Sequence, residues 1–235
     1  LLAVPFFMLA GEIMNVGGLS RRIVTLALAI VGHVRGGLGY VTIMAGCLLA
    51  ALSGSAVADA AALTALLLPM MVRAGHDKAR AGGLIAATGI IAPVLPPSIG
   101  LIIFGVAANV SISKLFMAGI APGLMIGMAL WFTWWWLVRK DKFVASPRQP
   151  RAVVVQALRD AAWALMLPVI ILVGLRMGVF TPTEAAVVAA VYALFVSTVI
   201  YRELKLGQLY GLFVSAARTT ACLLYTSPSP RDKRQ

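Results

Sequence analysis

The sequence predicts an all-α protein that crosses a membrane several times, with a re-entrant helical hairpin and a proline-broken helix among its spans. Of its 235 residues, 61% are hydrophobic and only 12% are charged, whereas soluble domains are about 45–50% apolar and about 25% charged. Apolar runs approaching the 20 or so residues needed to cross a bilayer recur along the chain. Lys and Arg cluster in the short segments between these runs, which is typical of cytoplasmic loops in membrane proteins.

Residues 1–16 are interpreted as the end of one span, and we expect a truncated start because the chain opens inside it. Residues 17–35 differ, because Arg21, Arg22 and Arg35 bracket the short apolar run IVTLALAIVG. A run of this length is too short to span, so it predicts an interfacial helix along the cytoplasmic face. A short buried span is the alternative.

Residues 38–72 are apolar on both sides of the motif SGSAVAD, which runs from Ser53 to Asp59. Each arm has about 15 residues, or roughly 22 Å of helix, whereas the hydrocarbon core is about 30 Å thick. These lengths predict a re-entrant helical hairpin with its tip at membrane depth. Two short tilted spans are the alternative.

Residues 79–109 have the length of a span but contain the segment GIIAPVLPPSIG. Pro93, Pro96 and Pro97 lack backbone donors and disfavour helix in the residues before them. We therefore expect two half-helices joined by an extended stretch, which is tolerated at membrane depth only beside protein or a wet cavity. A simple proline kink is the alternative.

Residues 115–138 form a full span that ends in four tryptophans, an interface anchor and not a nucleic-acid stacking platform. Further spans are expected over 161–175 and 183–200, and another begins at 209–221. With the hairpin returning to its own side, one side of the membrane carries fourteen Lys and Arg residues and the other only Lys114 and Arg176. This asymmetry places the basic loops in the cytoplasm.

Residues 222–235, CLLYTSPSPRDKRQ, break the membrane pattern in mid-segment. The string CLLYTSPSPRD is similar to the translation of a transposon-based sequencing-library adaptor. We therefore expect 222–235 to be a disordered artefact and the membrane domain to cover 1–221. A natural Ser/Pro/Arg tail is the alternative.

Three acids lie away from basic neighbours: Glu12, Asp59 and Glu184. A carboxylate at membrane depth is costly and is therefore a functional candidate. Asp59 is preferred, because the hydroxyls of Ser53 and Ser55 and freed carbonyls near Gly54 supply hard oxygen ligands for a cation. Half-helix N-termini at the same break suit an anion.

The PVLPPS break adds free carbonyls and the Ser98 hydroxyl. Together the two breaks predict a midplane site for an ion and an anionic solute. Close helix packing by Ser, Gly and Ala is the alternative.

Glu184 follows TPT and is expected to cap a helix start. Glu12 is expected near the cytoplasmic end of its span, with a nearby Arg as partner. No GxSxG, HExxH or Walker motif occurs in the sequence, so an enzyme is not predicted.

Five segments follow one another in a set order: VPFFMLAGEIMNVGGLSRRIV, GHVRGGLGYVTIMAGCLLAALSGSAVADAAAL, APVLPPSIGLIIFG, LFMAGIAPG and FTPTEAAVVAAVYAL. This series resembles the large permease subunit of TRAP transporters (DctM-like), in the ion-transporter superfamily. The resemblance implies a sodium-coupled elevator mechanism with two hairpins and two broken helices, one set in each inverted repeat. It makes SGSAVAD the first hairpin tip and PVLPPS the first broken-helix joint, and it implies that the second hairpin and broken helix follow Ala221.

The positions that the resemblance assigns to ion or substrate binding are Ser53, Gly54, Ser55, Asp59, Pro96, Pro97, Ser98, Thr88 and Asn109. Ser53, Ser55 and Asp59 are the candidate Na⁺ ligands, and no cofactor is expected. The implied function is import of a C4-dicarboxylate or sugar acid, with a small membrane subunit and a periplasmic solute-binding protein as partners and no nucleic acid. The alternatives are a related anion carrier without a binding protein and a structural membrane subunit.

Overall fold

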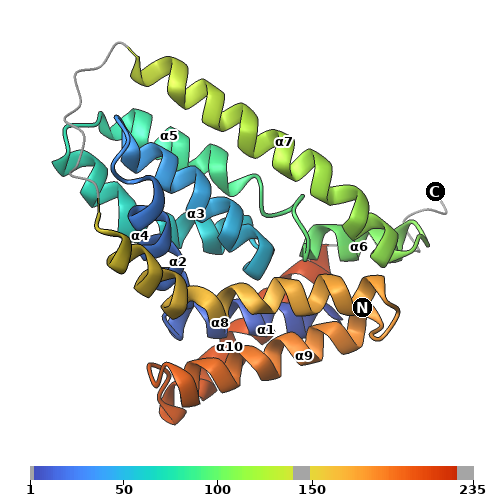
Figure 1. The fold of residues 1–235 in the computed structure, drawn as a ribbon. Helices are drawn as coiled ribbons and strands as arrows, with labels where there is room; N and C mark the ends of the chain where they lie inside the picture. The colour runs from blue at the N-terminus through green and yellow to red at the C-terminus, as the bar shows by residue number, and fades with distance from the viewer. Residues whose placement is uncertain (1–2, 140–148, 227–235) are drawn as a thin grey trace.

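The computed structural model describes residues 3–139 and 149–226, which form a helical bundle without strands (Figure 1). The elements are α1 (Ala3–Val16), α2 (Leu19–Val31), α3 (Gly37–Ser53), α4 (Ala56–Arg73), α5 (Lys78–Gly89), α6 (Ile99–Ala107), α7 (Ile112–Val138), α8 (Arg151–Arg176), α9 (Pro182–Phe195), the π-helical turn η1 (Val196–Ile200) and α10 (Leu206–Thr226). Four segments, α4, α7, α8 and α9 with η1, are long and apolar enough to cross a bilayer, and α1 with α2 adds a fifth if that bent pair is one span. The predicted all-α membrane fold is therefore confirmed.

The helices form two groups that meet along α1, α2 and α3 (Figure 1). In the first group α1 packs against α9 and α10, and α8 packs against α9. In the second group α3 packs against α4, α5 and α7, and α2 connects the groups by contacting both α3 and α8. The α1–α9 contact is close because α9 buries a row of alanines, and small side chains let apolar helices approach one another.

The bend between α1 and α2 measures 63° and lies at Gly17 and Gly18. Gly18 has φ of 76°, a left-handed conformation that glycine adopts at little cost. Beyond the bend, α2 buries one face, including Ile23 and Ala27, while Arg21 on its other side is exposed. The amphipathic character expected for this segment is present, and its position along the membrane face stays a prediction.

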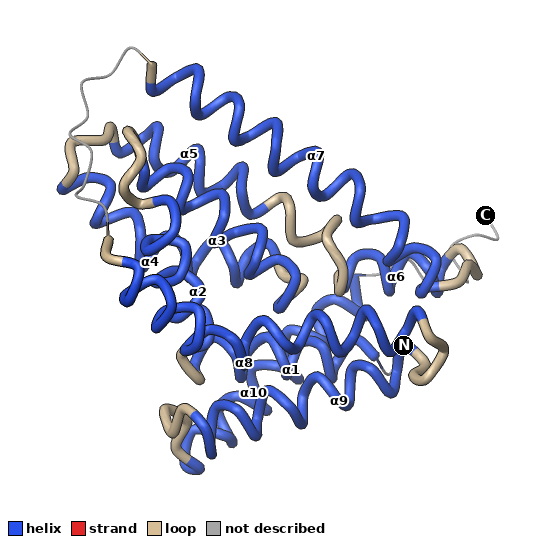
Figure 2. The backbone as a smooth tube through the Cα atoms, in the orientation of Figure 1, coloured by secondary structure: helices blue, strands red, loops and turns tan. Residues whose placement is uncertain are grey.

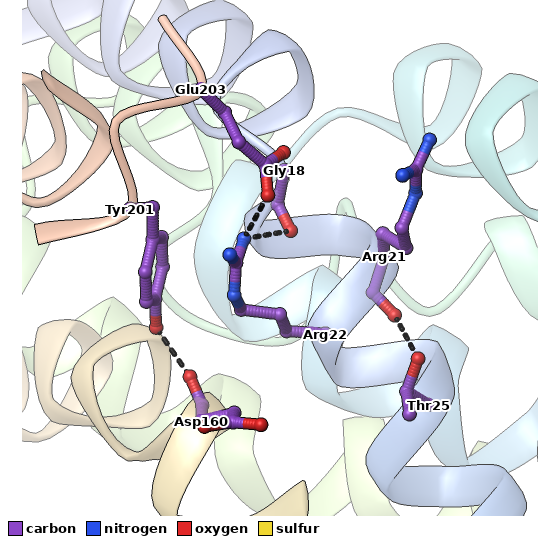
Figure 3. Close-up of polar contacts among 7 residues, drawn as sticks. All are labelled: Gly18, Arg21, Arg22, Thr25, Asp160, Tyr201 and Glu203. Carbon is purple, nitrogen blue, oxygen red and sulfur yellow. Dashed lines mark hydrogen bonds and ion pairs between the residues drawn. The ribbon is translucent and has the colours of Figure 1, made fainter.

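A polar cluster holds this bend in place (Figure 3). Arg22 donates to Glu203 at 2.7 Å and to the Gly18 carbonyl at 3.2 Å, and its guanidinium lies 3.7 Å from the centre of the Tyr201 ring. The Tyr201 hydroxyl donates to the Asp160 carbonyl at 2.6 Å. The Glu203 carboxylate lies directly over Gly18, so a side chain at this position would require Glu203 to move. The bend is thus attached both to the segment between η1 and α10 and to α8.

We expect Arg22→Ala to lower the stability of the protein by about 1–2 kcal/mol, since it removes a partly buried ion pair and a cation–π contact. Thermal unfolding of the purified full-length permease measures this effect. Arg21→Ala is the matched control, because Arg21 is exposed and only its backbone carbonyl has a described bond, from Thr25. An equal loss in the two variants would contradict a specific role for Arg22.

Only Gly54 and Ser55 separate α3 from α4, and the two helices pack against each other as a helical hairpin. With 17 and 18 residues, both helices are near the shortest length that spans a bilayer, so the re-entrant path stays a prediction. The proline segment is a true break and not a kink, because α5 ends at Gly89 and α6 begins only at Ile99. Figure 2 shows the non-helical stretch between them in tan.

Two helix ends differ from the predicted spans. α8 begins at Arg151 instead of Ala161, because Pro150 starts the helix and the residues after it are mostly good helix formers. α10 continues past Ala221 to Thr226, with Tyr225 92% exposed. Residues 227–235 of the expected artefact lie outside the described residues, so its boundary stays a prediction.

Candidate functional site

The hairpin tip is built by standard helix-end chemistry. Gly54 follows α3 in a left-handed conformation, φ 60°, which is the usual role of glycine after a helix C-terminus. Ser55 then caps α4, with its hydroxyl accepting from the Ala58 N–H at 3.4 Å. The Ser55 N–H donates in turn to the Ser53 hydroxyl at 3.1 Å. The tip therefore directs the Ser53 hydroxyl toward the first turn of α4.

Asp59 lies in that first turn and is buried, with 1% of its surface exposed. The Ser53 hydroxyl donates to Asp59 Oδ1 at 2.5 Å. Asp59 Oδ2 is buried without a hydrogen-bond partner among the described residues, and no described Lys or Arg pairs with the carboxylate. A buried carboxylate oxygen without a donor or a cation is costly, so this oxygen marks a place where a positively charged ligand would lower the free energy.

The proline break is a second buried site of irregular backbone. Pro96, joined to Pro97 by a cis peptide bond, and Ser98 are all buried. The Ser98 hydroxyl caps α6 by accepting from the Leu101 N–H at 3.3 Å, and it donates to the Pro93 carbonyl at 2.5 Å. Pro96 itself faces α7, near Gly119. The joint thus presents backbone carbonyls and a helix N-terminus at one place.

The two breaks contact each other at Gly54. A methyl group added there would collide with the Pro97 carbonyl oxygen and would lie 3.1 Å from Ser98 Cα. The starts of α4 and α6 therefore lie next to each other, and both helix dipoles present their positive ends there. Six of the predicted positions are brought together in this way, with Pro96 adjacent: Ser53, Gly54, Ser55, Asp59, Pro97 and Ser98.

Thr88 and Asn109 are placed elsewhere. Thr88 is buried in the last turn of α5, donates to the Leu84 carbonyl at 2.8 Å and packs its methyl group against Gly46 of α3, so it supports helix packing behind the tip. Asn109 is exposed at the far end of α6 from Ser98, about 14 Å away along a nine-residue helix.

The other two candidate acids, Glu184 and Glu12, each have a hydrogen-bond partner in the structure. Glu184 caps α9 as predicted, accepting from the Thr181 N–H at 2.7 Å. Among the residues that the structure describes, Glu12 pairs with no Arg and accepts instead from the Ser215 hydroxyl of α10 at 3.2 Å. A Cβ on its neighbour Gly11 would lie 3.6 Å from Ser53, which puts Glu12 at the level of the hairpin tip. Sequence reasoning missed this placement, because it took Glu12 as a residue near the end of its span.

Comparison with known families identifies the protein. Residues 1–226 match the family model described as Tripartite ATP-independent periplasmic transporter, DctM component. The chain belongs to this family.

Several curated relatives of this DctM-family chain are large permease subunits. It is 57% identical over 228 residues to the 2,3-diketo-L-gulonate TRAP transporter large permease YiaN of Escherichia coli, covering 96% of this chain and 53% of the relative. It is 44% identical over 221 residues to the sialic acid large permease SiaM of Vibrio cholerae, covering 94% and 52%. The C4-dicarboxylate large permease DctM of Pseudomonas aeruginosa is 40% identical over 225 residues, covering 96% and 53%.

The chain spans about half the length of the curated relatives it matches. The DctM family consists of transporter permeases and not of enzymes, and the family and the candidate spans place this chain as a multi-pass protein in the bacterial inner membrane. The resemblance seen in the five sequence segments is confirmed.

Proposed function

We propose that this chain supplies the first half of the transport site in a sodium-coupled secondary transporter that imports an organic anion delivered by a periplasmic binding protein. The observation that carries the proposal is the buried, unpartnered Oδ2 of Asp59 at the hairpin tip. A small membrane subunit and the binding protein are the partners that a tripartite family implies.

Sodium fits the surroundings of Asp59 better than a protein cation does. Sodium is a hard cation that oxygen atoms coordinate. The Ser53 hydroxyl bonds to the carboxylate, and the Ser55 hydroxyl caps the first turn of the same helix. The Pro97 carbonyl lies across the contact at Gly54 and adds a backbone oxygen. Discontinuous helices in secondary transporters use carbonyls freed in this way for ions. The proposed sodium ligands are therefore the side chains of Ser53, Ser55 and Asp59, with the Pro97 carbonyl as a candidate backbone ligand.

The same contact supports binding of an anion. The N-termini of α4 and α6 meet at the tip, and helix N-termini attract carboxylates through free N–H groups and the helix dipole. The relatives are named for 2,3-diketo-L-gulonate, sialic acid and C4-dicarboxylates, all of which carry carboxylates. An organic anion of this kind is the proposed substrate class.

Uptake into proteoliposomes tests the proposal directly. The full-length permease, reconstituted with its small subunit, should take up the anion only when the binding protein and an inward sodium gradient are both present. A potassium gradient of equal size is the matched control and should drive no uptake. Equal uptake with potassium would contradict sodium coupling, and undiminished uptake without the binding protein would contradict its role.

A further inference from the structure

Two neighbouring cavities lie along α1 and α4. They have three lining residues in common, Glu12, Ala58 and Ala61. The first, of about 200 Å³, reaches the hairpin tip at Ser53 and Ser55. The second, of about 450 Å³, continues in the opposite direction to Arg21 and Glu203 at the α1–α2 bend. The shared residues join the two cavities into one groove, which runs from the candidate ion site to the side where the basic loops gather.

Small and polar side chains line most of this groove. On α4 its wall is mainly alanine, which leaves room for a hydrated ion. Toward the bend it presents Asn15 and Ser20, which bond to each other at 2.7 Å. At its far end Glu203 is neutralised by Arg22, and Arg21 remains as a positive charge. A cation that moves along the groove would be repelled by Arg21 and therefore needs a compensating negative charge.

Glu12 supplies that charge where the two cavities meet. Its carboxylate is half-buried and has one described hydrogen bond, from Ser215, which leaves most of its acceptor capacity unused. Ser53, Ser55 and Thr219, which carry hydroxyl groups, line the same cavity. A carboxylate in partly dehydrated surroundings, with hydroxyls close by, is a favourable resting place for a monovalent cation.

Building on the sodium-coupled function proposed above, we infer that Glu12 is a second cation position, which holds sodium on its way between the hairpin tip and the cytoplasmic end of the groove. The position is distinct from that of Asp59, because Glu12 lines both cavities, whereas Asp59 is buried behind Ser53 and lines neither. The alternative role for Glu12 is a purely structural bond to α10.

The test uses the full-length permease with its partners in proteoliposomes, with sodium varied separately on each side. Wild-type uptake should rise with external sodium and be inhibited by internal sodium. Glu12→Gln keeps an acceptor for Ser215 but removes the charge. It should raise the internal sodium concentration for half-inhibition by about tenfold, the scale of one lost charge-assisted contact, and leave the external midpoint unchanged. Ser215→Ala is the matched control and should change neither value.

A second variant covers the case in which Glu12→Gln fails to fold. Ala61→Leu fills the groove from α4 without touching the charge, and it should also weaken internal inhibition several-fold. If a folded Glu12→Gln keeps the wild-type internal sodium concentration for half-inhibition, the inference is overturned. If Glu12→Gln does not fold, the same result in Ala61→Leu overturns it. An equal effect of Ser215→Ala also overturns it, because Glu12 would then have a structural role. A wild-type protein without any sodium dependence would instead reject the proposed function itself.

Discussion

Asp59→Asn should raise the sodium concentration for half-maximal uptake by at least about tenfold, because a contact to a charged group contributes about 1.5–3 kcal/mol. The substitution keeps the shape of the side chain and an oxygen that accepts from Ser53, so the hairpin tip is expected to fold. What is lost is the negative charge that balances the proposed ion. Sodium-titrated uptake by the reconstituted full-length permease measures the effect.

Glu184→Gln is the matched control for this prediction. It makes the same carboxylate-to-amide change at an exposed helix cap, outside the cluster of Asp59, Ser53 and Ser98. Its sodium midpoint should equal that of wild type. If Asp59→Asn also keeps the wild-type midpoint and maximal rate, Asp59 is not a coupling residue and acts instead as a buried helix-start residue of α4.

Gly54→Ala should have the largest effect on folding, a loss of about 2–4 kcal/mol, because two penalties combine. An L-residue in the left-handed conformation is disfavoured by about 1 kcal/mol, and Gly54 has φ of 60°. The added methyl group also collides with the Pro97 carbonyl, and such overpacking costs about 1–3 kcal/mol. The hairpin tip and the proline break would be forced apart, so transport should be lost as well.

Two other glycines separate these penalties in thermal unfolding experiments. Gly75 has φ of 87° but open space around it, so Gly75→Ala reports the backbone penalty alone. Gly82 lies within α5 with open space and ordinary backbone, so Gly82→Ala should be neutral or slightly stabilising. The expected order of destabilisation is Gly54, then Gly75, then Gly82. A Gly54 variant no less stable than the Gly75 variant would show that the tip does not depend on its contact with Pro97.

Much of this architecture is predictable because local chemistry decides it. Gly54 and Ser55 carry the signals for a helix end and a helix start, and three prolines interrupt the next helix at a place that the sequence alone defines. The pairing of Ser53 with Asp59 is also local, since Ser53 ends α3 and Asp59 lies in the first turn of α4, only six residues later. These features need no knowledge of how distant helices pack.

Features that depend on distant packing are not predictable in this way. Trp134 is one of four tryptophans at the end of α7, yet it is 1% exposed and donates to the Gly36 carbonyl at 3.0 Å, whereas Trp131, Trp135 and Trp136 are exposed. The sequence assigns all four equally to the membrane interface. Glu12 is another case, because its place beside the tip follows from Gly11 of α1 packing on Ser53 of α3. The sequence alone does not predict this contact between two helices. Asn109 is the opposite case. It is a polar residue predicted to line the site, but α6 places it at the end of the helix that is far from the site.

Sodium binding to the purified full-length permease, followed by thermal unfolding, tests the central claim most directly, because it needs neither substrate nor binding protein. A ligand that binds the folded state at about 100 times its Kd stabilises that state by about 2.7 kcal/mol. The Tm of the wild-type protein should therefore rise with sodium and not with potassium at equal ionic strength, and Asp59→Asn should remove the difference. An equal sodium-specific rise in wild type and Asp59→Asn would contradict a sodium site at Asp59.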